Sequence, residues 1–538
     1  MVAITHGVYV DLNRDGDFAD TSEDMSTYFK RVTIKRGVSK TFDTMARDTT
    51  IEVVLDNSDK RFSPDATGGL TGLKPGALVK VDMTYGGTTA TLGLGRIARD
   101  GISIQQGTKL NREATLKTFG YLRMLQEERT VILPLMTNVR TDAVISAIID
   151  AIGLYPLSSG GWKLGTAGYT ELDYTTVLAA DAGSYASLQT GDNLMAYVGD
   201  VWGEETSAYA MIRDLMAAES GLLFEARDGV LTMLNRSYFL TDVANAVDAT
   251  LTGSNLVARK KQDYRYGQDV VNDVTVTGYP RVVGAARSTV ARLYAAAGTG
   301  HIIPAGATRT FTLNYQQADG IGIGAYSVLC DPTTDYTLAY WNSVTQLIEA
   351  GSPSVGLTIT EGAGVVQLAF NNPETRNAIV MAGATDANNI TVRGYAVQAF
   401  DGVTASAQDL SSIGATGRQS TRFDLKLLTS ATAPQDMANF ELYNRSALRG
   451  GFAAMTLLAQ ASATHAAWVR DLTIGSRIAL SETQTGTSRE YFIVGEEHNI
   501  INAGYEHYAT YTLRPVHEDY WILGVTGFSE LDAVRLGY

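Results

Sequence analysis

The sequence has few residues for covalent or metal cross-links. Its 538 residues include a single cysteine, Cys330, so no disulfide can form within the chain and no cysteine-based zinc site is available. We expect Cys330 to be a small buried apolar side chain. Proline is scarce at 11 residues and glycine abundant at 53, with 45% apolar residues. This composition is typical of an ordered, β-rich protein rather than a disordered one.

Long apolar runs are also missing. No window of about 18 apolar residues occurs, which is the length that a membrane-spanning helix needs. Residues 1–30 lack the basic start and apolar stretch of a secretory signal. We therefore expect synthesis in a cytoplasm and no stable membrane insertion.

Positive charge is in deficit. The chain has 43 Lys and Arg against 57 Asp and Glu, a net charge of −14. Gripping nucleic acid requires Lys and Arg to neutralise phosphates, so this composition argues against a nucleic-acid-binding protein. An acidic wall would instead let DNA slide past without holding it.

Short catalytic motifs are absent as well. The sequence has no G-x-S-x-G elbow, no P-loop and no Rossmann fingerprint. Glu496, Glu497, His498 and His507 fall on two expected neighbouring strands and could face one another, but they match no short-range metal motif. We predict no catalytic residue, no cofactor and no metal. Paired carboxylates for glycan hydrolysis stay open as an alternative, because many acidic pairs exist.

The most informative stretch spans residues 30–64. Two β-branched runs, 32–34 and 51–55, alternate apolar and polar side chains, which is the pattern of a half-buried strand. Turn-forming residues follow each run, at 36–37 and at 56–59. By itself, this stretch predicts two neighbouring strands of a β-domain.

The same stretch resembles the central tail-tip or baseplate-hub proteins of tailed phages, often called minor tail proteins. Those chains carry an Arg-Gly strand and then a strand ending in Asp-Asn-x-Asp-x-Arg-Phe-x-Pro. Residues 272–276 and 521–524 are two further points of resemblance, to an Asn-Asp-Val-x-Val strand and a Trp-x-Leu-Gly ending. The match is structural rather than catalytic, and it implies a β-barrel that helps to build a tube. The residues of the main match are Arg36, Gly37, Asp56, Asn57, Asp59, Arg61, Phe62 and Pro64.

Before this stretch, residues 11–18 form an acidic segment that starts like a calcium loop. Oxygen-bearing side chains occupy positions 1, 3, 5 and 7, and Gly16 occupies position 6. The twelfth position is Ser22, however, where a bidentate Glu is needed. A tight turn between strands is therefore favoured over a calcium site.

We predict a β-rich, multidomain α+β fold in four parts. Residues 1–129 form a first hub-type β-barrel that docks on the tube, and 130–255 an α+β domain. Residues 256–425 form a second β-half with a β-rich insertion at about 285–400, and 426–538 a helix, a second hub-type barrel and a C-terminal segment. Expected strands lie at 5–10, 77–85, 92–98, 101–105, 113–119, 222–225, 230–234, 453–459, 477–482, 490–496 and 505–514.

Helices are expected at three places. Thr141-Asp142 begins one that ends near Gly153, a second starts near Thr206 and stops at Gly221, and a third spans 434–448, ended by Gly450-Gly451. Their apolar stripes indicate core packing. Residues 156–200 are rich in small residues and are expected to form a long excursion with little regular structure.

A weak internal repeat in the sequence predicts that the two barrels are related. Gly76 and Gly95 precede the strand at 113–119, and Gly475 and Gly495 precede a strand at 508–513; the paired glycines are 19 and 20 positions apart. The resemblance implies the same arrangement, two related barrels in each chain. Three such chains would give a ring of six barrels.

The resemblance implies a structural virion protein, a homotrimeric hub at the tail tip that caps the tail tube and organises its neighbours for DNA ejection. The implied partners are the distal tail protein and tail tube, the C-terminus of the tape-measure protein, tail fibres or other tip proteins, and DNA only in passage. The interaction candidates are Arg36, Arg61, Phe62 and Trp521. For Phe62 and Arg61 the alternative is packing at the barrel end and pairing with a nearby Asp.

Two other functions stay open. One is a tail-associated hydrolase of the cell wall. The other is a receptor- or glycan-binding tip protein, in which Tyr336, Tyr340 and Trp341 of the 285–400 block would stack against sugars. Strand aromatics are more often core or interface residues, which favours the structural hub.

Overall fold

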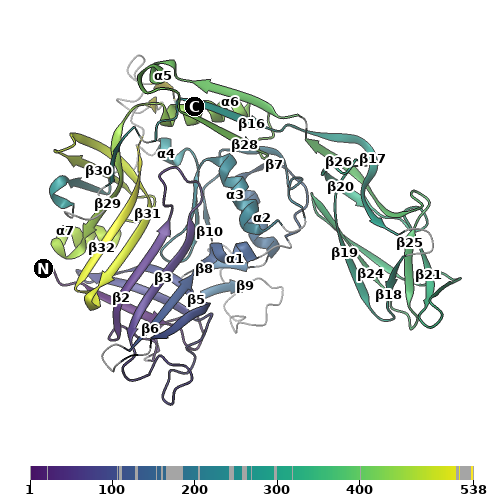
Figure 1. Ribbon diagram of the computed structural model, residues 1–538, viewed down its shortest axis with the longest axis horizontal. Helices are drawn as coiled ribbons and strands as arrows, with labels where there is room; N and C mark the ends of the chain where they lie inside the picture. Colours follow the sequence, from purple (N-terminus) through teal and green to yellow (C-terminus); the bar gives the residue numbers. More distant parts are fainter. Residues whose placement is uncertain are drawn as a thin grey trace.

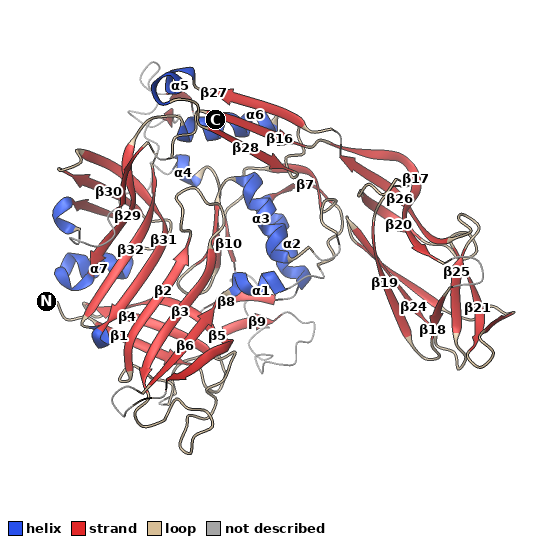
Figure 2. Cartoon of the chain, in the orientation of Figure 1, coloured by secondary structure: helices blue, strands red, loops and turns tan. Residues whose placement is uncertain are grey.

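The computed structural model contains a large curved β-sheet, a mixed α+β region and a projecting β-lobe (Figures 1 and 2). It is β-rich, with several separate sheets. No helix of the described part is long and apolar enough to cross a membrane. The described residues are 2–20, 22–105, 107, 112–127, 131–152, 154–158, 161–164, 186–203, 206–241, 247–256, 263–267, 269–295, 300–317, 319–399, 401–516, 520–521 and 535–536.

Six strands near the N-terminus form the first half of a twelve-stranded sheet. Burial alternates along most of them, as in β1 and β6, because one face packs on a core and the other faces outward. The expected strands at 92–98 and 101–105 are one long strand with an irregular register between Ile97 and Ile102. The strands are β1 (Thr5–Val10), β2 (Phe29–Gly37), β3 (Arg47–Asp56), β4 (Leu78–Tyr85), β5 (Thr88–Gln105) and β6 (Glu113–Phe119).

The second half of this sheet combines two distant parts of the chain. Two of its strands come from the middle of the sequence and four from the C-terminal part, with a helix, α7 (Ala463–Asp471), packed beside them. Gly450 and Gly451 were expected to end a helix, but they begin a strand and pair with Tyr266 and Arg265. The strands are β14 (Ala249–Thr252), β15 (Asp263–Tyr266), β29 (Gly450–Leu458), β30 (Arg477–Glu482), β31 (Thr487–Ile501) and β32 (Glu506–Pro515).

Both halves have the same strand order. Pairing runs β1-β4-β5-β6-β3-β2 in the first half and β14-β30-β31-β32-β29-β15 in the second. If the six strands of each half are numbered in chain order, both halves have the order 1-4-5-6-3-2. They differ in one orientation, since β1 pairs with β4 antiparallel and β14 with β30 parallel. The internal repeat predicted from glycine spacing is therefore present as a repeat of topology.

Matching hydrogen bonds relate the two halves residue by residue. The Gly76 N–H donates to the Ile97 carbonyl at 2.8 Å, and the Gly475 N–H to the Ile493 carbonyl at 2.8 Å. Gly76 thus corresponds to Gly475 and Ile97 to Ile493. The predicted match of Gly95 with Gly495 is wrong, because Gly95 precedes Ile97 whereas Gly495 follows Ile493.

The first half curls back on itself. The rings of His6 on β1 and Phe29 on β2 have centroids 6.4 Å apart, although the two strands lie at opposite ends of this half. A segment after β1 runs along its free edge, where the Met25 N–H donates to the Val8 carbonyl at 2.8 Å. The curvature encloses a core that includes Val8, Val53 and Leu116.

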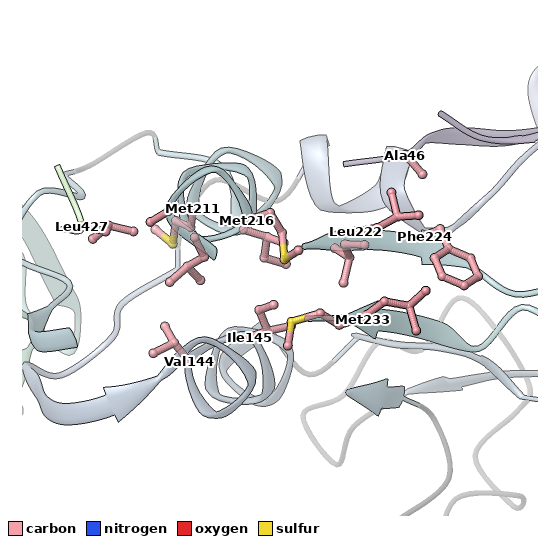
Figure 3. Close-up of a cluster of buried hydrophobic side chains, with 14 of the residues drawn as sticks. Ala46, Val144, Ile145, Met211, Met216, Leu222, Phe224, Met233 and Leu427 are labelled. Carbon is pink, nitrogen blue, oxygen red and sulfur yellow. The ribbon is translucent and has the colours of Figure 1, made fainter. Parts of the chain in front are cut away.

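The α+β region between the halves has its own helices and small sheets. Its two long helices face each other across buried apolar side chains such as Ile145 and Met216, and strands β12 and β13 continue this core (Figure 3). The helix predictions hold: α2 covers Thr141–Ile152, and α3 starts after the N-cap Ser207. The elements are α1 (Tyr121–Glu127), β7 (Met136–Arg140), α2 (Thr141–Ile152), β8 (Leu154–Ser158), β9 (Gly161–Leu164), β10 (Ala186–Leu188), β11 (Leu194–Val198), α3 (Ala208–Glu219), β12 (Leu222–Glu225), β13 (Leu231–Leu234) and α4 (Tyr238–Thr241).

Residues 156–200 contain more structure than expected. They include parts or all of β8 to β11, and β11 pairs antiparallel with β7. Residues 165–185 of this predicted excursion lie outside the described residues. The sequence pattern that predicts strands was weak here, because these strands have only three to five residues each.

A third sheet supports the projecting lobe. Its order is β27-β16-β28, and α6 packs against it. The helix expected at 434–448 is α6, which begins one residue earlier and ends at Arg445. The elements are β16 (Asp273–Gly278), β27 (Val403–Gln408), α5 (Leu410–Thr416), β28 (Ser420–Leu425) and α6 (Ala433–Arg445), with β33 (Tyr520–Trp521) and β34 (Arg535–Leu536) near the C-terminus.

The lobe leaves and re-enters the body between β16 and β27, which are antiparallel neighbours. It extends away from the body (Figure 1) and has its own core, which includes Val290, Phe370 and Cys330. The expected β-rich block is thus an insertion between two paired strands. Its strands are β17 (Arg281–Tyr294), β18 (His301–Ile303), β19 (Thr308–Asn314), β20 (Gly324–Leu329), β21 (Tyr336–Asn342), β22 (Leu347–Glu349), β23 (Gly356–Glu361), β24 (Val365–Asn371), β25 (Ala378–Ala382) and β26 (Asn389–Ala399).

Candidate functional site at the junction of the two sheet halves

The two halves are joined by one strand pair, β2 with β31. The register runs antiparallel from Val32 opposite Ile500 to Gly37 opposite Gly495. Gly37 has φ +77°, and a Cβ there would lie 2.6 Å from the Val494 carbonyl oxygen. A side chain at Gly37 therefore cannot be fitted without moving the backbone. The Arg-Gly pair of the sequence motif lies directly at this junction.

Arg36 forms the centre of the junction. Its Nε donates to Glu496 Oε1 at 2.9 Å, and its Nη2 contacts the same oxygen. Nη1 and Nη2 also donate to the Glu225 carbonyl at 3.1 Å and to Thr473 Oγ1 at 3.0 Å. Both ionised side chains are fully buried. One guanidinium thus joins the first half, the second half and the α+β region.

Glu496 has a second arginine partner. Arg227 donates from Nε to Oε1 and from Nη2 to Oε2, each at 3.2 Å. Arg227 also donates to the carbonyls of Arg470 at 2.5 Å and Leu472 at 2.6 Å. Burial alone would raise the pKa of Glu496, but attraction to Arg227 and Arg36 outweighs it and holds the pKa well below its usual value. Glu496 is therefore an ionised, fully bonded carboxylate.

A row of three histidines continues from Glu496. His498 Nε2 lies 3.5 Å from Glu496 Oε1, His498 Nδ1 lies 2.9 Å from His507 Nε2, and His507 Nδ1 lies 3.1 Å from His6 Nε2. Burial lowers the pKa of all three, for His6 to about 4. The rings are therefore neutral at pH 7, and they connect β1 to the second half.

The histidine and glutamate cluster is partly as the sequence suggested. Glu496, His498 and His507 do come together, whereas Glu497 is on the outer side, 3.9 Å from Lys35. Among the described residues, no group of three or more His, Cys, Asp or Glu side chains is placed to hold a metal ion. The sequence indicated Arg36 and Glu496 separately but not their ion pair, because the two residues lie 460 positions apart in the chain.

Two carboxylates, the buried Glu225 of β12 and the partly buried Asp48 of β3, form a pair beside the junction. Glu225 Oε1 accepts the Leu122 N–H at 2.8 Å, and Asp48 Oδ1 accepts the Gly120 N–H at 2.9 Å. Burial and the neighbouring Asp48 raise the pKa of Glu225 to about 7, and burial raises that of Asp48 to about 6. This pair titrates near neutral pH and links β3, β12 and α1.

The Asp-Asn-x-Asp-x-Arg-Phe motif forms a closed loop after β3. Asn57 Oδ1 accepts the Phe62 N–H at 2.9 Å, and Asn57 Nδ2 donates to Ser63 Oγ at 2.9 Å. Phe62 is fully buried, edge-on to Tyr28. Arg61 lies over the Tyr28 ring, 4.7 Å from its centroid, and bonds its hydroxyl. Phe62 packs at the end of the half, and Arg61 pairs with an aromatic ring rather than an Asp side chain.

The interaction candidates therefore differ in position. Within one chain, the side chains of Arg36 and Phe62 have no exposed surface with which to contact a neighbour, while Arg61 is partly exposed. The side chain of Trp521 lies outside the described ones. A role of these residues between subunits stays a prediction.

The acidic segment after β1 is built as a turn. Asp11 is fully buried, and its two carboxylate oxygens accept the N–H groups of Arg14 at 2.6 Å and Gly16 at 3.1 Å. Asp15 and Asp17 each accept the N–H two residues later. These carboxylates stabilise the turn, in agreement with the favoured interpretation.

The three aromatic residues proposed to stack on sugars do not form one surface. Tyr336 is 4% exposed and packs against Phe370 in the lobe core. Tyr340 donates to Glu374 at 2.7 Å and lies under Arg376, while Trp341 points to the opposite face of β21. The pattern was misleading because aromatics in a strand also fill its buried face.

One arginine-rich pocket lies beside β15, at the end of the sheet order. Its arginines have partners within the chain: Arg265 pairs with Asp263 at 2.5 Å, Arg489 donates to the Gly450 carbonyl at 3.0 Å, and Arg445 lies 3.7 Å from Glu441. Arg514 lies over the Phe239 ring at 4.1 Å. Most of the positive charge in this pocket is therefore already paired with groups of the same chain. Its arginines are Arg265, Arg445, Arg449, Arg489 and Arg514.

Comparisons with known proteins give distant similarities. No protein-family model matches the sequence, and no curated protein matches it. Crystal structures of the 43 kDa tail protein of prophage MuSo2 from Shewanella oneidensis and of a tail protein from Neisseria meningitidis MC58 are similar at TM-score 0.45, with 10% and 9% identity. Each comparison covers 95% of this chain, and 98% and 96% of the other.

Prophage tail protein gp18 from Listeria monocytogenes EGD-e is similar at TM-score 0.38 and 8% identity, over 94% of both chains. Similarity at these values assigns no function by itself.

Proposed function

We propose that the chain is a structural subunit of a phage tail tip, a homotrimeric hub that caps and continues the tail tube. The observation that carries this proposal is the identical strand order of the two sheet halves. Three copies would present six equivalent halves around one axis. A ring of this kind can dock on a tube with six-fold symmetry.

The junction gives each subunit the stiffness that such a ring needs. Strand pairing and a buried Arg36–Glu496 ion pair hold the two halves at a fixed angle. Buried ion pairs with complete hydrogen bonding resist rearrangement, because breaking one leaves a charge unpaired in a medium of low dielectric constant. The functional role of the junction is then mechanical rather than catalytic.

The remaining features fit partners of a tail tip. The lobe of residues 281–399 projects from the body and offers an arm to tail fibres or other tip proteins. The proposed ring docks on the distal tail protein and tail tube, and its lumen receives the C-terminus of the tape-measure protein. A net charge of −14 per chain favours passage of DNA without binding. The protein is made in the host cytoplasm and functions in the virion.

The hydrolase alternative has less support. The buried carboxylates of Glu496 and Glu225 are occupied by arginines and backbone N–H groups, so neither faces a substrate. The sugar-binding alternative loses its proposed platform, since Tyr336 is buried. We therefore propose a structural protein that is not an enzyme.

The native mass of the purified chain tests the proposal. Light scattering coupled to gel filtration should give three times 57.7 kDa at micromolar concentration. A ring of obligate subunits buries about 2,000 Å² or more at each interface, so it should persist on dilution. A monomer at tens of micromolar would contradict the hub.

A further inference from the structure

One strand pairing that the repeat of the two halves would predict is not formed within the single chain. This inference rests on the proposed ring and names the surfaces by which its copies meet. Within the chain, β2 of the first half pairs with β31 of the second. In the repeat, β2 corresponds to β15 and β31 to β5. The equivalent pairing would therefore join β15 to β5.

Residue correspondences follow from the ladders. Ile97 pairs with Thr118 and Ile493 with Leu513, so Thr118 and Leu513 correspond. Four residues earlier on each strand, Ala114 corresponds to Ala509. Their partners Leu55 and Leu457 therefore correspond as well. Ile104 pairs with Ala114 and His498 with Ala509, so Ile104 corresponds to His498. By the same count, Ile102 and Gln105 correspond to Glu496 and Asn499.

The partner strand can be matched in the same way. Counting from Leu55 and Leu457, Glu52 corresponds to Ala454. Thr33 pairs with Glu52 and Asp263 with Ala454, so these two residues correspond. Beyond the register shift after Asp263, Arg265 lies opposite Gly451. This is the position equivalent to that of Arg36 in β2.

Both equivalent edges lack a partner strand in the single chain. Among the described residues, β15 pairs only with β29, and residues 101–105 of β5 pair only with β6 because β4 covers just the earlier part of that strand. Tyr266 is 67% exposed and Ile104 39% exposed. In the other half, the stretch that corresponds to 101–105 is the one that β2 covers.

We propose that β15 of one copy adds antiparallel to residues 101–105 of β5 in a second copy, with Asp263 opposite Gln105 and, beyond a one-residue bulge in β5, Arg265 opposite Ile102. The contact repeats the β2·β31 junction between chains. It is heterologous, because it joins two different surfaces, and such contacts form a ring when the rotation between neighbouring copies closes. Backbone hydrogen bonds along the two strands supply the pairing, and burial of Tyr266 and Ile104 adds apolar contact.

Engineered cysteines test this register directly. Directly opposite residues of antiparallel strands have Cβ atoms about 4.5–5.5 Å apart, close to the distance that a disulfide requires. The native Cys330 is buried and 5% exposed, so it gives little background. Chains carrying Asp263→Cys and differently sized chains carrying Gln105→Cys would be mixed, assembled and oxidised under mild conditions.

The expected product is a covalent heterodimer on a non-reducing gel. In randomly mixed rings of three it can contain at most about half of the chains, and we expect the yield to approach that value. The matched control replaces Gln105→Cys by Thr89→Cys, an exposed residue of the same strand in the part covered by β4. This control should give less than a tenth of that product. Equal cross-linking of both pairs would overturn the inference.

Native mass separates this inference from the proposed function. A trimer without the expected cross-link would overturn the strand contact and leave the hub intact, whereas a monomer would overturn both. A second variant, Ile104→Asp, should weaken self-association at least tenfold, while Thr89→Asp should leave it unchanged. A trimer equally stable in both variants would also contradict the contact.

Discussion

At the scale of single residues, Glu496 is the side chain that holds the partners at the junction together. It accepts hydrogen bonds from two buried arginines, Arg36 and Arg227. Replacing it with Gln leaves two guanidinium groups buried without a counter-charge. Removing one member of a buried ion pair costs about 3–5 kcal/mol. We therefore expect Glu496→Gln to lower the free energy of unfolding by about that amount in urea denaturation.

The neighbouring Glu497 provides the control. It is on the outer side of the same strand, half exposed and 3.9 Å from Lys35. Exposed ion pairs contribute about 0–1 kcal/mol, so Glu497→Gln should change stability little. Equal effects of the two substitutions would show that burial at the junction is not what makes Glu496 important.

The carboxylate of Glu225 gives a prediction about pH. Its pKa of about 7 in the folded state exceeds the unfolded value of 4.5, so the folded protein holds this proton more tightly. Stability from this group is full below pH 4.5 and is lost as pH rises toward 7. Glu225→Gln should remove that loss of stability. Relative to wild type, the free energy of unfolding should then rise by about 3 kcal/mol between pH 4.5 and pH 8.

The three histidines change the stability of the fold with pH in the opposite direction. Their lowered pKa values mean that the unfolded chain binds protons more readily below pH 6.5, so they reduce stability as the pH falls toward 4. The wild-type curve combines both effects, and the difference between wild type and Glu225→Gln isolates one. Parallel unfolding curves from pH 4.5 to 8 would contradict the assignment to Glu225.

At the scale of elements, the close approach of β2 and β31 depends on Gly37. A Cβ at Gly37 would lie 2.6 Å from a backbone oxygen and 2.7 Å from the Cα of Gly495. Gly86 also has positive φ, +60°, but nothing lies within 4 Å of its Cβ position. Gly86→Ala measures the backbone strain alone, about 1 kcal/mol.

Gly37→Ala adds the clash to that strain. We expect its thermal midpoint to fall clearly further than that of Gly86→Ala, because the two strands must separate to make room. If both substitutions shift the midpoint equally, the tight packing of the junction is not required for stability.

Elements with a local pattern could be predicted, and contacts between distant elements could not. The strands β1 and β6 were predicted at their observed bounds, because alternation and turn residues define them. The helix α7 was missed, although Ser462 caps it by accepting the His465 N–H at 3.2 Å. Its short length, nine residues, and alanine-rich sequence gave little apolar periodicity.

The junction illustrates why the site itself was harder to predict. Arg36 and Gly37 were singled out from a motif, but Arg36 was taken as a candidate for contacts between subunits or with the tube, and Gly37 only as part of the motif. Their partner strand lies more than 450 residues away, and pairing over that distance leaves no local pattern in the sequence. The similar spacing of the glycines indicated the repeat, but it aligned the two halves wrongly. Gly95 and Gly495 are not equivalent, because a Cβ at each position would meet different neighbours.

At the scale of the whole molecule, the lobe should be separable from the body. It has its own core, and it leaves and re-enters between Gly278 and Val403, which are paired neighbours. Replacing residues 281–399 with a short glycine-rich turn should therefore keep the twelve-stranded sheet folded. We expect the shortened chain to form the proposed trimer as the full chain does, with a mass reduced in proportion to the deleted residues.

An aggregated or unfolded product of this deletion would show that the lobe is part of the folding unit. A folded monomer would instead assign the contact between copies to the lobe. In that case β15 and β5 would not be sufficient for assembly.

We propose that two equivalent sheet halves in each chain build a six-part ring from three copies. Electron cryomicroscopy of the purified full-length protein would show such a ring. We expect closed particles with three-fold symmetry and six similar barrel-like features around a central opening. Particles with two-fold symmetry, open filaments or single chains at micromolar concentration would contradict it.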